Sequence, residues 1–511
     1  MTGAVPPDPH SGRVGAWPCV GWWLALLMLL ALGVRLHGIN QSLVTFHPTR
    51  HYRSAVIARA CYYDATPSIE PWARRLADAA RSMQPAGEPP FMEWIACESY
   101  RAIGHEDIRV PRILVMICWI LGAIPLHALA RRASSGVCAI VAAALYLFMP
   151  YAIVATRSFQ PDAPMTLCTL IAVLAVARYF ESPVTSRFVT AVLLVGLATM
   201  VKPMSVFLTL PALIGLAWAR QPWRALVVNR RFALLVLLGF LPATLYYGYG
   251  AVFGTLARDQ MRMRFVPALL ASSFFWHGWL TQIRRVFGLP LFGLSILAAL
   301  IAPRPGARAL IAALWIGYAA FAVAFTYHMP THDYYHLPYV AIVALGAAAT
   351  LERLHRWVAT RVPSAVVFAG ASTVTAAIVI WGSLAAWPRL TNPRADATVA
   401  AYERIGELTH HDPNVLFLDL EYGYSLMYHG QLSGDSWPNT DDLAAERLGG
   451  EPPITAQERF DRDYASGKPS YFVVTDLASL KAEADLRALL DDRVTVVEKT
   501  PTYHVYQFKA E

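Results

Sequence analysis

The sequence contains few charged residues for its length. Only 15% of its 511 residues are charged and 56% are hydrophobic, whereas a soluble protein is about 25% charged and about 45–50% apolar. The deficit is uneven, because long apolar runs fill residues 18–388 and residues 389–511 have an ordinary soluble composition. We therefore expect a disordered N-terminus (1–17), an α-helical polytopic membrane domain (18–388) and a small C-terminal α/β domain (389–511).

The chain also lacks the motifs that bind nucleotides. It has no G-x-G-x-x-G turn after a strand and no P-loop, so we expect no nucleotide site. Its formal net charge of +8 does not indicate a nucleic-acid partner, because the basic residues lie in short loops between apolar segments rather than on one face.

The six cysteines lack metal-ligand spacing. Four of them lie in or beside apolar segments, where cysteine usually serves as a small core residue. Cys61 and Cys97 both fall in one polar stretch and can pair if that stretch faces an oxidising compartment. The sequence does not fix the distance between them, so the pairing stays open.

The apolar segments indicate about eleven membrane spans. They lie at 17–36, 110–130, 136–156, 163–181, 187–201, 203–220, 231–251, 287–303, 308–328, 334–352 and 365–387. Arginine is concentrated in every second loop, which places those loops in the cytoplasm. The other loops and, with an odd number of spans, the C-terminal domain then face outward. The protein is expected in a bacterial inner membrane with that domain in the periplasm.

The longest of the outward loops is the first, residues 39–109. Residues 54–63, 71–83 and 91–103 have the amphipathic pattern of short helices that lie flat on a membrane surface. In the C-terminal domain, strand-like runs at 415–420, 471–475, 494–498 and 503–508 alternate with helical runs at 395–408 and 477–490. This alternation predicts a small α/β fold.

Ionisable and aromatic residues near the predicted spans gather on the outward side. Carboxylates, a lysine and histidines at the mouth of a helical bundle can hold a phosphate and take a proton from a hydroxyl. The candidates are Glu88 and Glu93 in the first loop, Asp162, Lys202, and His332, Asp333, Tyr335 and His336 before the tenth span.

Each candidate also has a structural interpretation. Asp162 can N-cap the helix that follows it, and Lys202 can be a lysine that reaches from the membrane to water. The residues at 331–336 can be interfacial aromatics. Glu88 can orient the Pro-Pro turn, and Glu93 can lie on a solvated helix face. Only the joint placement of these residues favours a catalytic site.

The arrangement resembles the GT-C class of polytopic glycosyltransferases, and most closely glycosyltransferase family 39 with its aminoarabinose-transferase and protein O-mannosyltransferase relatives. The resemblance covers roughly residues 18–388. It rests on five short motifs, which are Ile57-Ala58-Arg59, Glu88-Pro89-Pro90, Pro161-Asp162, Lys202-Pro203 and Asp333-Tyr334-Tyr335-His336-Leu337-Pro338. The resemblance implies a polyprenyl-phosphate sugar as donor, no nucleotide and a large first outer loop.

The chain departs from the family at the start of that loop. The family usually has an aspartate there, which is thought to act as base or to bind a metal, whereas this chain has His47 and then Arg50 and Arg53. We interpret His47, Arg50 and Arg53 as donor-binding residues, because arginine suits a phosphate. The base is then Asp162 or Glu88, with Glu93 and His47 as further candidates. We assign no metal ligands, although the resemblance allows a divalent metal.

The sequence therefore predicts an enzyme that transfers a sugar from a polyprenyl-phosphate donor to an extracytoplasmic acceptor, which can be a lipid, a glycan or a protein. Arginine and lysine stabilise the charge on the departing phosphate, and a carboxylate takes the proton of the acceptor. Two alternatives remain at this point. One is a transporter or flippase of lipid-linked sugars, and the other is a catalytically inactive GT-C scaffold.

Overall fold

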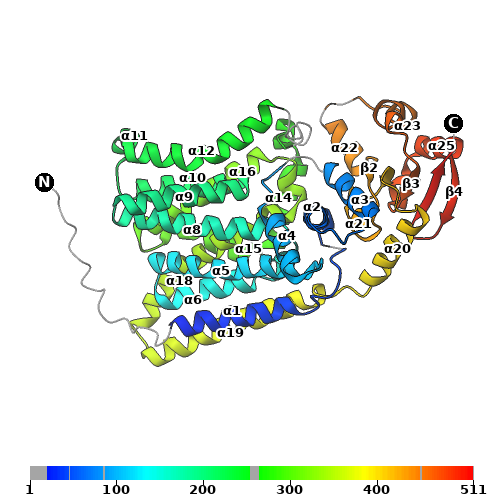
Figure 1. Ribbon diagram of the computed structural model, residues 1–511. Coiled ribbons are helices and arrows are strands. Elements are labelled where there is room, and N and C mark those ends of the chain that lie inside the picture. Colours follow the sequence, from blue (N-terminus) through cyan, green and yellow to red (C-terminus); the bar gives the residue numbers. More distant parts are fainter. Residues whose placement is uncertain are drawn as a thin grey trace.

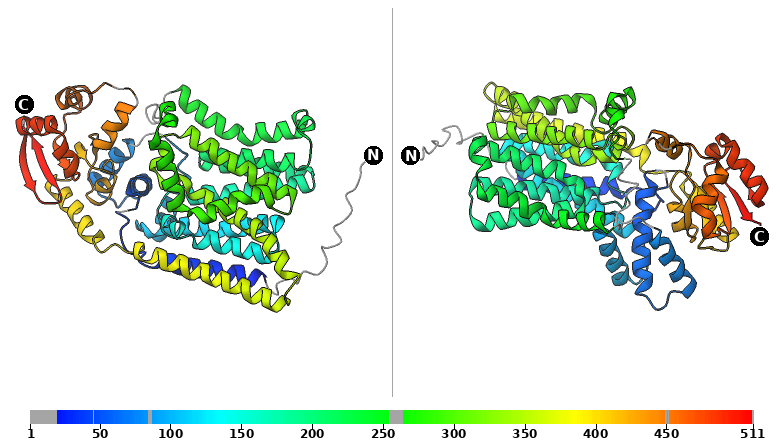
Figure 2. Two further views of the ribbon diagram at one scale, coloured as in Figure 1. Left: turned by 180° about the vertical axis from the view of Figure 1, so that it is seen from behind. Right: turned by 90° about the horizontal axis from the view of Figure 1, so that it is seen from above.

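The computed structural model describes residues 20–44, 46–83, 87–253, 264–448, 450 and 452–509. The N-terminus that is expected to be disordered, residues 1–17, lies outside this part. A long helical bundle and a smaller domain with a sheet lie end to end, and the blue helices of the first loop lie at their junction (Figures 1 and 2). The predicted fold class, a polytopic helical domain followed by a small α/β domain, is confirmed.

A helix coincides with each of the eleven predicted apolar segments. The segment at 136–156 forms two helices, α6 and α7, because Pro150 interrupts the helical hydrogen bonds. The bundle helices are α1 (Val20–Leu36), α5 (Arg109–Ala133), α6 (Gly136–Phe148), α7 (Pro150–Ala155), α8 (Asp162–Glu181), α9 (Thr185–Val201), α10 (Val206–Trp218), α12 (Arg230–Val252), α15 (Leu289–Ile301), α16 (Pro305–Ala324), α18 (Val340–Ala359) and α19 (Ser364–Ala386).

Within the described residues, six of these helices are long and apolar enough to cross a membrane by themselves. A seventh crossing is possible where α14 (Ser273–Val286) and α15 follow one another with a bend of 97°. The helices α1, α6, α9 and α10 are apolar but shorter. The number of spans therefore stays a prediction.

Buried arginines stabilise the end of the bundle that carries the first loop. Arg35 donates to the carbonyl oxygens of Ala31 and Leu147 at 3.1 and 2.8 Å. Arg112 and Arg157 likewise donate to backbone carbonyls. Carbonyls at helix C-termini lack intrahelical partners and carry partial negative charge, so a cation there is favourable. These three arginines therefore tie the chain segments at this end of the bundle together through backbone carbonyl oxygens.

The first loop folds into α2 (Pro48–Asp64), α3 (Pro71–Ser82) and α4 (Phe91–Ile103). All three predicted helices are present, and α2 begins six residues earlier than predicted because Pro48 occupies its first turn. The helix α2 packs between α4 and α21 (Tyr424–His429) of the C-terminal domain. Much of its surface is therefore buried against protein.

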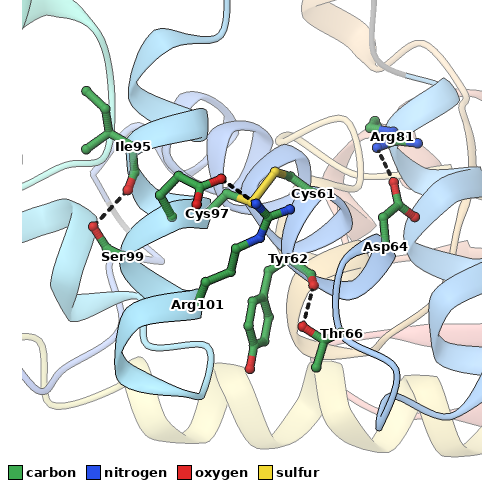
Figure 3. The surroundings of a disulfide bond; sticks show 10 residues. Cys61, Tyr62, Asp64, Thr66, Arg81, Ile95, Cys97, Ser99 and Arg101 are labelled. Carbon is green, nitrogen blue, oxygen red and sulfur yellow. Dashed lines mark hydrogen bonds and ion pairs between the residues drawn. A yellow bond between two sulfur atoms is a disulfide. The ribbon is translucent and has the colours of Figure 1, made fainter.

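A disulfide joins Cys61 in α2 to Cys97 in α4, with 5.9 Å between the Cα atoms (Figure 3). An ion pair of 2.8 Å between Arg81 and Asp64 ties α3 to the end of α2 in the same view. The pairing that the sequence left open is thus present. Disulfides persist in oxidising compartments, which agrees with an outward-facing loop.

Removing this disulfide should destabilise the protein. The bond closes a loop of 36 residues, and such a cross-link contributes about 2–4 kcal/mol, mainly by restricting the unfolded chain. The variant Cys61→Ser/Cys97→Ser should melt at a lower temperature in detergent than the control Cys118→Ser, which removes a free cysteine. Dithiothreitol should lower the melting temperature of the wild type and leave the double-serine variant unchanged. An unaffected wild type would contradict the pairing.

The C-terminal domain contains a five-stranded sheet with the order β2-β1-β3-β5-β4. Strands β2 (Gly434–Ser436), β1 (Val415–Leu418) and β3 (Tyr471–Val474) are parallel, while β5 (His504–Phe508) runs antiparallel to β3 and to β4 (Val494–Lys499). The helices are α20 (Ala395–Leu408), α21, α22 (Thr440–Leu448), α23 (Ala456–Arg459), α24 (Leu477–Ala482) and α25 (Ala484–Arg493).

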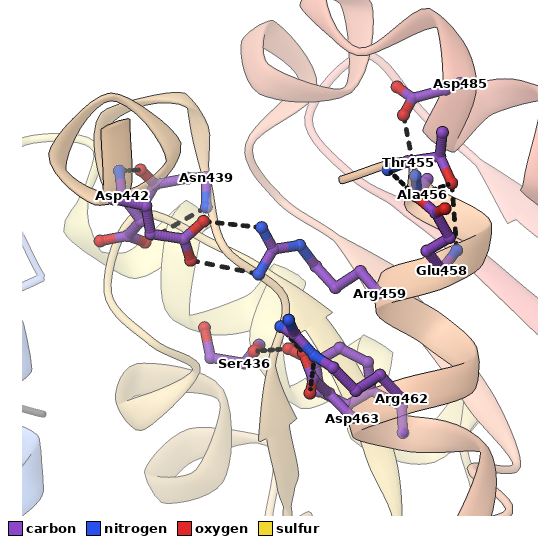
Figure 4. A network of polar contacts seen from close by, with 12 residues as sticks. Ser436, Asn439, Asp442, Thr455, Ala456, Glu458, Arg459, Arg462, Asp463 and Asp485 are labelled. Carbon is purple, nitrogen blue, oxygen red and sulfur yellow. Dashed lines mark hydrogen bonds and ion pairs between the residues drawn. The ribbon is translucent and has the colours of Figure 1, made fainter. Parts of the chain in front are cut away.

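Polar contacts hold the helices of this domain together (Figure 4). Arg459 in α23 donates from its two terminal guanidinium nitrogens to the two carboxylate oxygens of Glu446 in α22 at 3.1 and 2.7 Å. Thr455 and Glu458 form a capping box at the start of α23. The amide of Ala456 donates to Asp485 in α25 at 2.8 Å. These contacts join α22, α23 and α25 and have a structural role.

Candidate active site

A buried ion pair lies where α8 begins and α9 ends. The ammonium of Lys202 is 2.8 Å from both carboxylate oxygens of Asp162, and each side chain is at most 3% exposed. Asp162 makes no N-cap bond, and Lys202 does not reach water, so neither structural interpretation applies. A buried charge is tolerated only with a partner, so each residue requires the other.

A second ion pair from the first loop lies beside the first. Arg50 in α2 is 3.6 Å from Glu88. Burial raises the pKa of Glu88, but the charges of Arg50, Lys202 and Arg53 outweigh that effect and lower the pKa to about 2. Glu88 is therefore an ionised carboxylate among cations, and it links the first loop to Lys202.

A third group of contacts surrounds Asp333, in the 3-10 helix η3 (Asp333–Tyr339) that precedes α18. One oxygen of Asp333 is 2.5 Å from Nε2 of His47 and accepts the hydroxyl of Tyr151 at 2.6 Å. The other oxygen lies 3.3 Å from Arg285 in α14. Four distant segments of the chain thus meet at one buried carboxylate.

The backbone of His47 is strained. Its φ is 45° and its ψ is 51°, which is the left-handed region that non-glycine residues seldom adopt. Such a conformation costs about 1–3 kcal/mol and persists when surrounding contacts enforce it, often at functional sites. The bond to Asp333 holds His47 in this conformation.

The three groups of contacts surround the ring of Tyr334. The ammonium of Lys202 is 5.7 Å and the guanidinium of Arg50 is 5.9 Å from the ring centre, and the His47 ring lies 4.9 Å away. We use the name charged cluster for the ionisable residues of the three groups, which are His47, Arg50, Glu88, Asp162, Lys202 and Asp333.

The other predicted site residues lie around this cluster. Glu93 is buried, which raises its pKa, and it accepts the hydroxyl of Ser54 at 2.6 Å. It therefore does not lie on a solvated face. Arg53 contributes positive charge near Glu88. Tyr335 packs against Phe321, and its ring centre lies 5.9 Å from the ammonium of Lys202.

The two predicted histidines, His336 in η3 and His332 at its N-terminal cap, have different surroundings. His336 is fully buried, and its ring nitrogens bond to the hydroxyl of Tyr318 at 2.7 Å and the carbonyl of Met329 at 2.9 Å. It holds η3 against α16. His332 is partly exposed and bonds to Thr331 at 2.7 Å, and its ring lies 5.5 Å from Tyr334.

The C-terminal domain reaches this site through Glu421, which follows β1. One oxygen of Glu421 accepts the amide and the hydroxyl of Thr49 at 2.9 and 2.6 Å. Thr49 lies between His47 and Arg50 in the sequence. The domain therefore fixes the start of α2, and with it the position of two cluster residues.

An apolar cavity lies beneath the charged cluster, inside the bundle. Its volume is about 20 Å³, which is room for about one water molecule. Asp162, Thr166 and Thr169 lie on one face of α8, since they follow the spacing i, i+4, i+7, and the two threonines line the cavity. Its other lining residues are Leu126, Leu129, Leu170, Val173, Leu208, Leu314, Pro338, Ala341, Ile342 and Leu345. Polar and apolar subsites therefore follow one another along α8.

The described side chains do not fit a divalent metal. Within the part of the chain that the structure covers, no three His, Cys, Asp or Glu side chains converge as metal ligands. His47, at the position where the resemblance allows a metal ligand, instead gives Nε2 to Asp333. We derive no step of the reaction through a metal ion.

Together, the helical bundle, the first loop of surface helices, the cluster above an apolar cavity and the C-terminal domain define the GT-C fold. The chain has this fold and resembles glycosyltransferase family 39, as its motifs predict. Residues 87–247 match the family described as dolichyl-phosphate-mannose-protein mannosyltransferase. No curated protein matches the chain in sequence.

Solved structures with the same fold include ArnT from Cupriavidus metallidurans. The structure of its complex with undecaprenyl phosphate has a TM-score of 0.59 and 16% sequence identity to this chain. The match covers 96% of this chain and 98% of that one. The apo state has a TM-score of 0.61 at 15% identity, with the same coverage. The oligosaccharyltransferase AglB from Archaeoglobus fulgidus, in complex with an inhibitory peptide and a dolichol-phosphate, has a TM-score of 0.54 at 12% identity, and 97% of this chain covers 75% of it.

Three site residues were not predicted from the sequence. Tyr151, Arg285 and Glu421 contact the cluster or the residues that hold it. Arg285 and Tyr151 lie in or beside apolar segments where one polar side chain carries no distinguishing pattern. Glu421 lies two residues after Asp419, a buried residue that follows β1. Binding sites in α/β domains often lie beyond the carboxyl ends of strands, and this position is the only sequence signal for Glu421.

Proposed function

We propose that the protein is a membrane glycosyltransferase that transfers a sugar from a polyprenyl-phosphate donor to an extracytoplasmic acceptor. The observation that carries this proposal is the succession along α8, where a buried charged pair at Asp162 is followed by an apolar cavity lined by Thr166 and Thr169. An anionic head group suits the charged residues, and the apolar side chains that follow along α8 are the kind of surface that a hydrocarbon tail contacts.

The charges suit a phosphate leaving group. Arg50 and Lys202 lie within 6 Å of one aromatic ring, and Arg53 adds further positive charge. As the bond between the anomeric carbon and the phosphate breaks, negative charge grows on the phosphate oxygens, and preorganised cations stabilise it. Asp162 and Glu88 hold these cations in place.

The comparisons support the donor class. In one of the related structures ArnT is bound to undecaprenyl phosphate, and in another AglB is in complex with a dolichol-phosphate. We infer the same class of donor for this chain, an inner-membrane location, and an outward-facing domain at residues 389–511. The disulfide between Cys61 and Cys97 agrees with an oxidising periplasm.

The purified protein in nanodiscs tests this function. It should cleave at least one of a panel of radiolabelled undecaprenyl-phosphate sugars (mannose, glucose, galactose and arabinose), with cell-envelope extract as acceptor. A transporter would move these lipids across proteoliposomes without cleaving them, and an inactive scaffold would do neither. Failure to cleave any donor, with the protein folded, would overturn the proposal.

Filling the cavity should impair use of the lipid donor. Leu170 is 8% exposed and lines the cavity, so the variant Leu170→Trp should raise the KM for the undecaprenyl-phosphate donor by about tenfold or more, because about 1.4 kcal/mol of lost binding is tenfold. The matched variant Leu193→Trp changes a side chain that is 66% exposed on α9, and its KM should equal that of the wild type. Equal values for the two variants would place the tail elsewhere.

A further inference from the structure

We propose that His47 is the general base that takes the proton from the acceptor hydroxyl, and that Asp333 and Tyr151 are positioning residues that hold its ring. This inference rests on the proposed glycosyl transfer. It assigns a catalytic role at the position where the chain departs from its relatives.

The first observation is the bond itself. Nε2 of His47 and an oxygen of Asp333 are 2.5 Å apart, and Asp333 is only 3% exposed. A carboxylate is an acceptor, so Nε2 carries the proton and Nδ1 keeps its lone pair. The same carboxylate oxygen accepts Tyr151, and Arg285 lies at the other oxygen. These contacts fix Asp333, and Asp333 fixes the ring tautomer that a base requires.

The second observation is the position of the histidine. Its side chain is 26% exposed while its partner is buried, so a substrate can reach the ring. Its left-handed backbone at φ 45° and ψ 51° places the ring against Tyr334 at 4.9 Å. Arg50 and Lys202 approach the same tyrosine ring. The base and the phosphate-binding cations thus lie around one side chain, as a single reaction centre requires.

Within the described residues, Nδ1 of His47 has no hydrogen-bond partner. Asp162, in contrast, gives both carboxylate oxygens to Lys202. Glu88 faces Arg50 and has a pKa of about 2, which makes it a weak proton acceptor. Of the candidate bases, His47 has the most exposed side chain, and within the described residues the lone pair on its Nδ1 is unoccupied.

The transfer conserves atoms and electrons. The acceptor oxygen gives its proton to Nδ1 of His47 and its electron pair to the anomeric carbon. The bond between that carbon and the phosphate oxygen breaks, and polyprenyl phosphate leaves with the bonding electrons. Asp333 stabilises the imidazolium that forms. The proton then passes from Nδ1 to solvent as product departs.

The charged and titratable groups that face the His47 ring come from several elements. They are Asp333, Tyr334 and His332 from η3 and its cap, Tyr151 from α7, Arg285 from α14, Arg50 from α2 and Glu421 from the C-terminal domain. The nearest, Asp333, is a carboxylate whose oxygen lies 2.5 Å from Nε2 of the ring.

The test compares pH profiles of kcat/KM for wild type, His47→Gln, Asp333→Asn and the control His105→Gln, using the undecaprenyl-phosphate sugar that the wild type cleaves fastest. His105 is exposed at the end of α4. The wild-type rate should fall at low pH as one group protonates. His47→Gln should lose about 100- to 10,000-fold in rate together with that acidic limb. Asp333→Asn should move the limb to lower pH, because a negative neighbour is removed.

Melting temperatures of the variants in detergent separate folding from chemistry. If His47 is only a structural tether, His47→Gln will retain the acidic limb at whatever rate remains, and Asp333→Asn will not move it. Either result would overturn the dyad while leaving transfer by the wild type intact. If instead the wild type cleaves no lipid-linked donor, the proposed function fails and the dyad fails with it.

Discussion

Replacing Asp162 with alanine should abolish transfer and destabilise the protein by about 3–5 kcal/mol, because the change leaves the ammonium of Lys202 buried without a partner. Both side chains of the pair are at most 3% exposed, so water cannot solvate the remaining charge. The melting temperature in detergent and the rate of cleavage of a lipid-linked donor measure the two effects.

A double substitution separates the structural effect from the functional one. Replacing a buried ion pair with apolar residues of similar size is often neutral or stabilising, so Asp162→Leu/Lys202→Met should regain much of the lost stability without regaining transfer. The control Arg356→Met breaks an ion pair with Glu352 whose arginine is 53% exposed, and it should leave transfer unchanged. If the double variant transfers sugar normally, the pair has only a structural role.

Arg50→Ala should reduce transfer by about 100- to 1,000-fold, as expected when one preorganised group that stabilises developing charge is removed. Arg50 faces Glu88 at 3.6 Å and lies over Tyr334, so the substitution also leaves Glu88 with less positive charge. Binding of radiolabelled undecaprenyl phosphate should weaken in parallel, because the same guanidinium holds the product.

Two further variants define the role of Arg50. Arg50→Lys keeps the charge without the planar fork, and it should recover only part of the activity. Arg101→Ala removes an arginine that pairs with Glu98 on the exposed face of α4 and should have no effect. Unchanged phosphate binding by Arg50→Ala would contradict a donor-binding role for α2.

Most of the fold was predictable from hydropathy and from the residues that end helices and strands. The helices α4 and α20 have the predicted boundaries, because an amphipathic pattern with clear end signals fixes both ends. Strand β2 was missed, since its three residues, Gly434–Ser436, have no strand-like alternation. The predicted helix at 477–490 is two helices that meet at Glu483, where no proline or glycine marks the break.

The site was predictable only where the sequence places charge beside a span. Asp162 and Lys202 were found separately, and their contact across 40 residues agrees with both lying at one end of the bundle. The bond between His47 and Asp333 joins residues 286 positions apart, and no local pattern encodes such a contact. Tyr151 and Arg285 were missed for the same reason, because their role depends on tertiary packing around Asp333.

The release of polyprenyl phosphate tests the central claim most directly. Purified wild-type protein in nanodiscs would be incubated with radiolabelled undecaprenyl-phosphate sugars and, in parallel, with the corresponding nucleotide sugars, beside Asp162→Leu/Lys202→Met as the folded inactive control. We predict that the wild type releases undecaprenyl phosphate from at least one lipid donor, that it leaves the nucleotide sugars intact, and that the control cleaves neither kind of donor. Cleavage of nucleotide sugars, or equal release by wild type and control, would contradict a lipid-linked donor bound at the charged cluster.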